Sequence, residues 1–231
     1  MKPVVQKYDY KSLERVTNDV TGKRYYISPD GRKLSSVTTI LSATKDDAGL
    51  KAWRDWVGES EANRIVKEAT GLGSLMHEHL ENWMIGKPRP SGNNVVRKMA
   101  SEMADVIIAQ GMPNVDEVWG IEEALYFPGL YAGMTDLVGV HKGEPAIMDY
   151  KTANKMKKPE HVKDYFLQGS AYALAHNEMF GTNLRKVVLF MVARDLSYKE
   201  WVLEGSEFDA ATTEWFGRVD QFIEMKKNGK V

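Results

Sequence analysis

Two acidic residues and a lysine in the middle of the chain could act together on a phosphate ester. Asp149 and Lys151 lie two residues apart in a largely apolar run, and Asp136 lies upstream in the segment Gly133-Met-Thr-Asp. Carboxylate oxygens suit Mg²⁺ or Mn²⁺, and a lysine ammonium can stabilise charge that develops on a phosphoryl group. These residue types indicate metal-assisted phosphodiester hydrolysis, although Asp-x-Lys alone also occurs on ordinary solvated strands.

Strands are needed to hold these side chains. The β-branched and aromatic content predicts strands over 131–140 and 146–151, joined by a turn that contains glycine and proline. Side chains alternate between the two faces of a strand, so Asp149 and Lys151 should share a face, roughly 7 Å apart. The sequence therefore predicts a β-hairpin that presents a carboxylate beside an ammonium.

A predicted helix upstream offers a third candidate metal ligand. Gly73, His77 and Glu81 recur at intervals of four residues and share one helix face. His79 points to nearly the opposite side, and the zinc motif His-Glu-x-x-His does not occur in the sequence. His77 is thus a candidate ligand, with an ordinary helix histidine as the alternative interpretation.

Two further pairs of polar residues flank the hairpin in the sequence. Gln168 and Tyr172 lie one turn apart on the helix predicted after it, where they could reach DNA or the lysine, or pack in the core. Glu122 and Glu123 lie on the strand predicted before it, so alternation sends one to the metal and the other to solvent. We expect Glu123 to face the metal.

Composition limits the class of protein. With 231 residues, 43% hydrophobic and 27% charged, the chain fits a single globular domain with an ample core. It has no cysteine, which excludes disulfides, cysteine nucleophiles, thiolate zinc sites and iron–sulfur clusters. No targeting peptide or apolar stretch of membrane-spanning length is recognisable, so we expect a cytoplasmic protein that has no membrane partner.

Charge is unevenly distributed although the formal net charge is only −1. Residues 1–56 hold 11 Lys and Arg against 7 Asp and Glu, and residues 151–163 hold 5 Lys against one Glu. Residues 195–231 hold 5 basic and 8 acidic residues. This pattern predicts a basic side that suits an anionic partner, although scatter over a solvated surface explains it equally well.

Candidate DNA contacts combine hydroxyls, cations and flat rings. Ser36 is a candidate N-cap of a helix whose first amides could hold a phosphate oxygen, or it caps that helix without a ligand. Bases stack on aromatic rings, although Trp53 and Val57 share a helix face and could instead be core. The candidate DNA contacts are Ser35, Ser36, Lys45, Lys51, Trp53, Arg54, Lys155 and Lys157.

The order of predicted elements defines the fold class. Expected in turn are a hairpin over 24–36, helices over 37–42, 50–69, 72–85 and 94–110, strands over 115–127, 131–140 and 146–151, a helix over 159–180, strands over 186–192 and 199–203, and a helix over 207–227. This order predicts an α/β (α+β) fold, in which helices flank a mixed central β-sheet. Residues 1–22 show little periodicity and are expected to form a loose arm.

The motifs together resemble a known family. In chain order they are Gly73-x-x-x-His77, a Glu on a strand, Gly133-x-x-Asp136, Asp149-x-Lys151 and Gln168-x-x-x-Tyr172. This series resembles the RecB-like branch of the PD-(D/E)XK nuclease superfamily, from about Tyr25 to the last strands. Segments 26–41 and 50–54 are similar in particular to phage exonucleases and the mitochondrial genome maintenance exonuclease.

The resemblance implies a role for each motif residue. The implied metal ligands are His77, Asp136, Asp149 and the carbonyl of Tyr150. The implied catalytic lysine is Lys151, the implied accessory residues that position DNA and the lysine are Gln168 and Tyr172, and the implied upstream acid is Glu123. Several RecB-like relatives carry a four-cysteine iron–sulfur cluster, and a chain without cysteine falls outside that subgroup.

The resemblance also implies an organisation and an activity. A single nuclease domain over 1–231 would comprise an arm (1–22), a hairpin and helical region where DNA enters (23–112) and a restriction-endonuclease-like catalytic core (113–231). The implied activity is that of a Mg²⁺- or Mn²⁺-dependent DNA exonuclease that acts from free ends and favours single strands. The setting would be phage-type DNA replication, recombination or degradation, in the host cytoplasm if the chain is phage-encoded.

The residues by themselves leave other functions open. A site-specific or structure-specific endonuclease would use the same metal centre. A non-catalytic nucleic-acid-binding module could keep the fold without the chemistry. A non-nuclease metalloenzyme is the remaining alternative.

Overall fold

A computed structural model of the protein describes residues 3–18 and 24–231. The strands are β1 (Glu14–Thr17), β2 (Arg24–Ile27), β3 (Lys33–Ser36), β4 (Val115–Phe127), β5 (Tyr131–His141), β6 (Glu144–Ala153), β7 (Val187–Ala193) and β8 (Tyr198–Leu203). The helices are α1 (Val37–Thr44), α2 (Ala48–Val57), α3 (Glu59–Met84), α4 (Val95–Gln110), α5 (Lys163–Phe180) and α6 (Gly205–Lys227), with short 3₁₀ helices η1 (Met112–Asn114) and η2 (Pro159–His161). This order confirms the mixed α/β fold with a helical N-terminal region.

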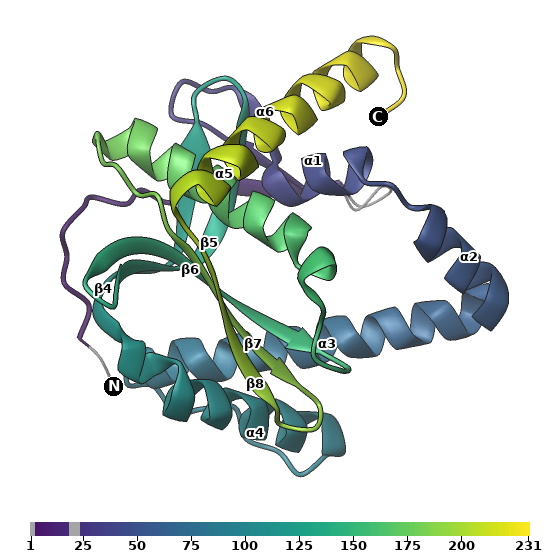
Figure 1. Ribbon diagram of the computed structural model, residues 1–231, viewed down its shortest axis with the longest axis vertical. Helices are drawn as coiled ribbons and strands as arrows, with labels where there is room; N and C mark the ends of the chain where they lie inside the picture. Colours follow the sequence, from purple (N-terminus) through teal and green to yellow (C-terminus); the bar gives the residue numbers. More distant parts are fainter. Residues whose placement is uncertain (1–2, 19–23) are drawn as a thin grey trace.

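Helices cover both faces of the central sheet (Figure 1). α1, α5 and α6 pack on one face, and α3 and α4 pack on the other. Neighbouring residues of a strand contribute to opposite layers, as Ile147 and Met148 do on β6. In the part of the chain that the structure describes, none of the helices combines the length and apolar character needed to cross a bilayer.

The sheet forks beside β5. β4 pairs with one edge of β5 along its length, from Phe127 opposite Tyr131 to Val115 opposite His141. β3 and β6 must therefore share the other edge, where β3 pairs in parallel with Tyr131 and Ala132 and β6 pairs antiparallel with residues 137–141. On that edge, residues 133–136 have no strand partner among the described pairings. We call this opening between β3 and β6 the fork.

The N-terminal helices break at a different place from the one expected. The sequence suggested a helix over 50–69 and another over 72–85, whereas α2 ends at Val57 and α3 continues unbroken through Gly71 and Gly73. Gly58 forms the break with φ 85° and ψ 144°, a backbone conformation that favours glycine. Gly73 stays helical, and a Cβ there would make only an ordinary contact with the Thr152 hydroxyl, at 3.5 Å.

The described part of the expected N-terminal arm, residues 3–18, is mostly exposed but makes specific contacts with the rest of the fold. The Val5 N–H donates to the Val118 carbonyl (2.8 Å), and residues 14–17 form β1 against β2. The Tyr10 hydroxyl is hydrogen-bonded to Nε2 of the buried His176 (2.9 Å). Aromatic contacts that hydrophobic periodicity does not reveal hold this segment. Residues 1–2 and 19–22 of the expected arm lie outside the described residues.

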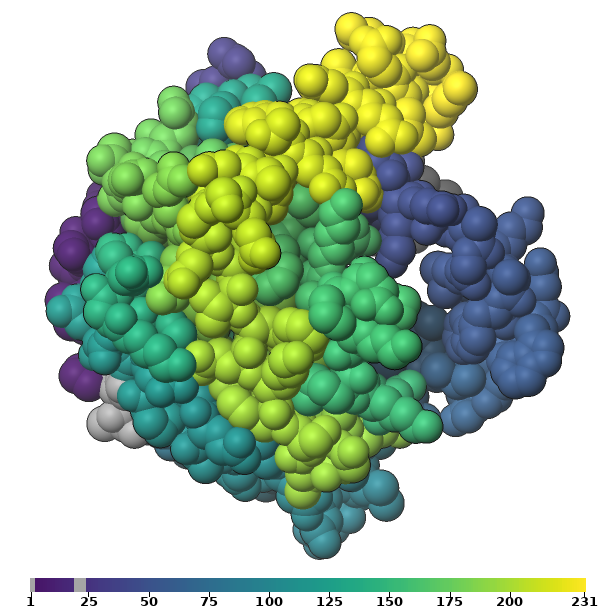
Figure 2. All heavy atoms as spheres, in the orientation of Figure 1, coloured from purple at the N-terminus to yellow at the C-terminus, as the bar shows by residue number. Residues whose placement is uncertain are grey.

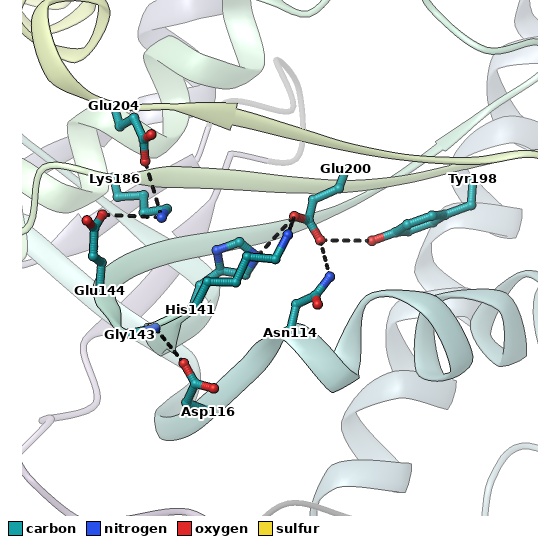
Figure 3. A network of polar contacts seen from close by, with 10 residues as sticks. Asn114, Asp116, His141, Gly143, Glu144, Lys186, Tyr198, Glu200 and Glu204 are labelled. Atoms are coloured by element: carbon teal, nitrogen blue, oxygen red, sulfur yellow. Dashed lines mark hydrogen bonds and ion pairs between the residues drawn. The ribbon is translucent and has the colours of Figure 1, made fainter.

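A network of charged groups joins the β5–β6 turn to β8 (Figure 3). The turn precedes the first residue of β6, whereas Lys151 lies near the last residue of that strand. Glu200 accepts hydrogen bonds from Lys142 (2.7 Å) and Asn114 (2.8 Å) and lies 3.2 Å from Nε2 of the buried His141. Burial alone would raise the pKa of Glu200, but the hydrogen bonds from Lys142 and Asn114 outweigh it and hold the pKa below its usual value. The carboxylate is therefore a structural anchor.

Replacing this anchor should destabilise the fold in a pH-dependent way. Glu200→Gln should lower the free energy of unfolding at pH 7 by about 2 kcal/mol, because charge-assisted hydrogen bonds are lost. The folded-state pKa of Glu200 is lowered, so its contribution is complete above the ordinary value of 4.5 and disappears as the pH falls below it. Urea unfolding at pH 7 and pH 3.5 measures both effects. A deficit of equal size at both pH values would contradict this role.

Candidate active site

Three carboxylates line up across β4, β5 and β6. Extending the β5–β6 register by one residue beyond Leu137 opposite Met148 places Asp136 opposite Asp149. On the other side of β5, Ile121 pairs with Leu137 and Glu123 pairs with Thr135. Glu122, which lies between these two residues of β4, is therefore opposite Asp136. Opposite residues of antiparallel strands point to the same face, so the three acids form one row.

Asp136 lies at the fork, where β5 and β6 separate. Its Oδ2 accepts a hydrogen bond from the Tyr150 N–H at 2.8 Å, and the same oxygen lies 3.5 Å from Nδ1 of His77. Nε2 of His77 donates to the Tyr150 carbonyl at 2.9 Å, which fixes the ring and turns Nδ1 toward the acid. His77 thus reaches the carboxylates from the α3 layer through the open edge of β5.

Lys151 reaches the same place from the α5 layer. Its ammonium forms an ion pair with Asp149, which shares its face of β6, and donates to the Gln168 amide oxygen at 3.4 Å. The Gln168 amide nitrogen donates in turn to the Tyr172 hydroxyl at 3.2 Å. Tyr172 packs directly against Gly133 at the fork. The Gln-x-x-x-Tyr pair of α5 therefore holds the lysine in position.

Charge interactions set the protonation of this cluster. Burial alone would raise the pKa of Asp136, but His77 and Lys151 outweigh it and keep the pKa below its usual value. Burial alone would lower the pKa of His77, but Asp136 outweighs it and raises the pKa to about 9. Burial would also lower the pKa of Lys151, but Asp149 and Asp136 raise it above the usual value. Lys151 is therefore an ammonium at neutral pH.

The other two acids, Asp149 and Glu122, have raised pKa values. Burial and the nearby charge of Asp136 raise the pKa of Asp149 to about 6. The same two causes, in the same order, raise the pKa of Glu122 to about 7. Like charges held together in a buried site disfavour full ionisation, and a bound cation relieves that repulsion.

The donor set fits a hard divalent cation. One ligand atom each from His77, Glu122 and Asp136 lie within 4.8 Å of one another, and Asp149 follows Met148, the last residue of β6 that pairs with β5 on this side. Carboxylate oxygens with one imidazole suit Mg²⁺ or Mn²⁺, and cysteine is absent from the chain. These residues can therefore hold a metal at the fork.

Glu122, rather than the expected Glu123, faces the other acids. Glu122 has a positive φ of 52° and lies beside Asp136 and His77. Glu123 lies on the opposite face, near Gly120 and Tyr10. The turn between β4 and β5 could have identified Glu122. This turn pairs Phe127 with Tyr131, and pairing residue by residue away from it places Glu122 opposite Asp136.

The candidate DNA contacts do not all gather at the acids. Ser35 and Ser36 are buried, and Ser36 caps α1 by accepting from the Thr39 N–H at 3.0 Å, the simple capping role. Figure 1 shows α2, which carries Lys51, Trp53 and Arg54, away from the sheet. Arg54 is bound to Glu59 and Asn63, at 2.7 and 2.9 Å. Lys45 and Lys157 instead line one cavity beside Tyr165 at the start of α5.

A methyl group at Gly133 should disturb Tyr172. The Cβ of Gly133→Ala would lie 2.6 Å from a ring carbon of Tyr172, so we expect a loss of about 1–3 kcal/mol in unfolding free energy from overpacking. Gly217→Ala on α6 is the matched control, because a Cβ there meets no atom within 4 Å. Urea unfolding compares the two variants. Equal stability would show that Tyr172 does not depend on this glycine.

Comparison with known proteins supplies the context for this geometry. No protein-family model matches the sequence, and no curated protein matches it significantly. The solved structure of a "putative exonuclease" from Eubacterium rectale is similar with a TM-score of 0.51 and 16% identity, over 71% of this chain and 69% of that one. An alkaline exonuclease from Laribacter hongkongensis is similar with a TM-score of 0.35 and 12% identity, over 85% and 92%. The chain thus shares the fold of the Eubacterium rectale protein, a mixed sheet flanked by helices.

Proposed function

We propose that this chain is a Mg²⁺- or Mn²⁺-dependent DNA exonuclease that hydrolyses phosphodiester bonds from free ends. The observation that carries the proposal is the row of Glu122, Asp136 and Asp149, with His77 on one side and Lys151 on the other. The fold shared with a protein described as a "putative exonuclease" supports it, as does the order of motifs that resembles RecB-like nucleases.

The acids and the histidine would hold the metal. His77, Glu122, Asp136 and Asp149 are its proposed ligands, and the Tyr150 carbonyl, which already meets His77, is a further candidate. A divalent cation bound there would polarise the phosphate and lower the pKa of a bound water. The Tyr150 N–H keeps Asp136 oriented, and His77 and Lys151 keep it ionised, so this ligand is preorganised before substrate arrives.

Lys151 would act on the phosphoryl group. Its ammonium is held at the fork by Asp149 and Gln168, and the site keeps it charged. An ammonium in that position can donate hydrogen bonds to a phosphate oxygen as negative charge increases in the transition state. Tyr172 and Gln168 act through Lys151 and are positioning residues.

The loop after β6 would bind the DNA backbone. Lys155, Lys157 and Lys158 follow Lys151 closely, and no carboxylate pairs with these three within the described ranges 3–18 and 24–231. Unpaired ammonium groups favour contact with phosphates, and a strand that reaches the fork from its end would pass them. We expect a single strand, whose bases are unstacked, to be preferred over a duplex.

Removing either central group should abolish cleavage while the fold is retained. Lys151→Ala and Asp149→Asn should each lower the cleavage rate at least about a hundredfold, because each removes transition-state stabilisation. Labelled single- and double-stranded DNA with open or blocked 5′ and 3′ ends, incubated with Mg²⁺ or Mn²⁺, measures the rate. Circular dichroism verifies folding. Full activity in either variant would refute the assignment of this site.

The substrate ends decide between two kinds of nuclease. Closed circular DNA and end-blocked DNA should resist the wild-type protein under conditions that degrade open linear DNA. Cleavage of the closed circle at a rate similar to that of linear DNA would instead identify an endonuclease. DNA that is bound but never cut would identify a binding module.

The two adjacent glutamates provide a matched test of the metal site. Glu122→Gln should weaken Mn²⁺ binding about tenfold or more, because it removes a charged ligand from the row of acids. Glu123→Gln, one residue away on the opposite face, should leave the affinity within about twofold of wild type. Isothermal titration with Mn²⁺ measures both. A larger loss of Mn²⁺ affinity in Glu123→Gln than in Glu122→Gln would instead support Glu123 as the ligand, as the sequence predicts.

A further inference from the structure

Tyr165 lies beside the candidate active site without a role in the chemistry proposed above. Tyr165, Gln168 and Tyr172 are spaced three and four residues apart on α5, so they lie along one helix face. Tyr172 is buried and touches Gly133 at the fork, whereas Gln168 and Tyr165 are half-buried. The face of α5 that holds Lys151 therefore runs from the buried Tyr172 to the more exposed ring of Tyr165.

Two cavities meet at Tyr165 and Lys157. One, of about 150 Å³, lies between α3 and the end of β6 and is lined by Leu72 and Thr152 together with these two residues. The other, of about 380 Å³, lies between the α1–α2 connection, η2 and α6. Figure 2 shows the molecule hollowed between the blue segment that contains α2 and the green segment after β6. The ring of Tyr165 is therefore accessible from more than one direction.

Two ammonium groups lie loosely over the ring. Nζ of Lys151 is 5.0 Å from the Tyr165 centroid, and Nζ of Lys157 is 5.7 Å from it. Both distances are near the long end of the cation–π range, so such contacts are weak. Lys157 has no ion pair among the described residues. A phosphate would therefore attract this ammonium more strongly than the ring does.

Four acids line the larger cavity, and Asp164 and Glu214 among them are ion-paired, whereas Asp46 and Glu160 have no described ion pair. Asp164 lies 3.5 Å from Lys45 and 3.7 Å from Arg218, and Glu214 lies 2.8 Å from Lys163. These pairs leave Lys157 as a cation free to meet an anion. A flat ring and a free ammonium together fit a nucleotide, which offers a flat base and a phosphate.

We propose that Tyr165 and Lys157 form a subsite for the nucleotide next to the scissile bond, in which the ring stacks on the base and the ammonium binds its phosphate. The inference rests on the proposed nuclease function, because that function places the scissile phosphate at Lys151. A nucleotide covalently joined to that phosphate lies within reach of Tyr165, since Nζ of Lys151 is 5.0 Å from the centroid of that ring. Stacking is tolerant of sequence, so the subsite should accept every base.

The test combines protein variants with DNA that lacks a single base. Tyr165→Leu should raise KM for single-stranded DNA about tenfold with little change in kcat, and Tyr165→Phe should restore it, because the ring alone stacks. Wild-type protein should show a similar rise in KM when an abasic residue occupies one of the first four positions from the cleaved end. At that position, Tyr165→Leu should add no further effect, because base and ring belong to one interaction.

A second readout isolates the phosphate contact. Lys157→Gln should weaken binding of all sequences alike and reduce the slope of log affinity against log salt by about 1, since one phosphate contact is lost. Tyr25→Leu on β2 is the matched control, because Lys33 lies over that ring at 4.0 Å in a comparable pair. Its KM should equal that of wild type. Thermal unfolding of each variant identifies loss of fold.

The outcomes separate the subsite from the function on which it rests. Wild-type protein that cleaves no DNA with either metal would remove the proposed function itself. Wild-type protein that cleaves DNA but tolerates an abasic residue at every position would overturn the subsite alone, even if Tyr165→Leu failed to fold. Independent, multiplying effects of the abasic residue and Tyr165→Leu would also overturn it.

Discussion

The hydrogen bond from the Tyr150 N–H to the Asp136 carboxylate is the interaction on which the candidate site depends. β4 occupies one edge of β5 completely, so β3 and β6 must share the other edge and leave residues 133–136 without a strand partner there. Where an unbroken sheet would continue backbone pairing, the side chain of Asp136 accepts from Tyr150 instead. This exchange opens the sheet and places a carboxylate in the opening.

Groups from both helical layers can meet in this opening. In a continuous sheet, the strands would separate α3 from α5, and each helical layer would lie roughly 10 Å from the sheet. At the fork, His77 arrives from the α3 layer and contacts Asp136, while Lys151 is held from the α5 layer by Gln168. Gly133 on β5 makes the approach of α5 close enough, because a side chain there would collide with the ring of Tyr172.

Crowded acids are costly for the folded protein and useful for binding a cation. Burial and mutual repulsion raise the pKa values of Asp149 and Glu122, while the network around Glu200 lies at the opposite end of β6 and joins the strands there (Figure 3). The stable end of the sheet thus supports an end where like charges are held together. Proteins commonly concentrate such unfavourable arrangements at functional sites.

By itself, the sequence determined the order of the elements, the shared face of Asp149 and Lys151, and the motif spacings, because these follow from local periodicity and propensity. Two features were decided by tertiary structure. The choice of Glu122 over Glu123 depends on strand register, and the attachment of the arm depends on contacts with distant rings such as that of His176. Each involves residues far apart in the chain, whose proximity no local pattern records.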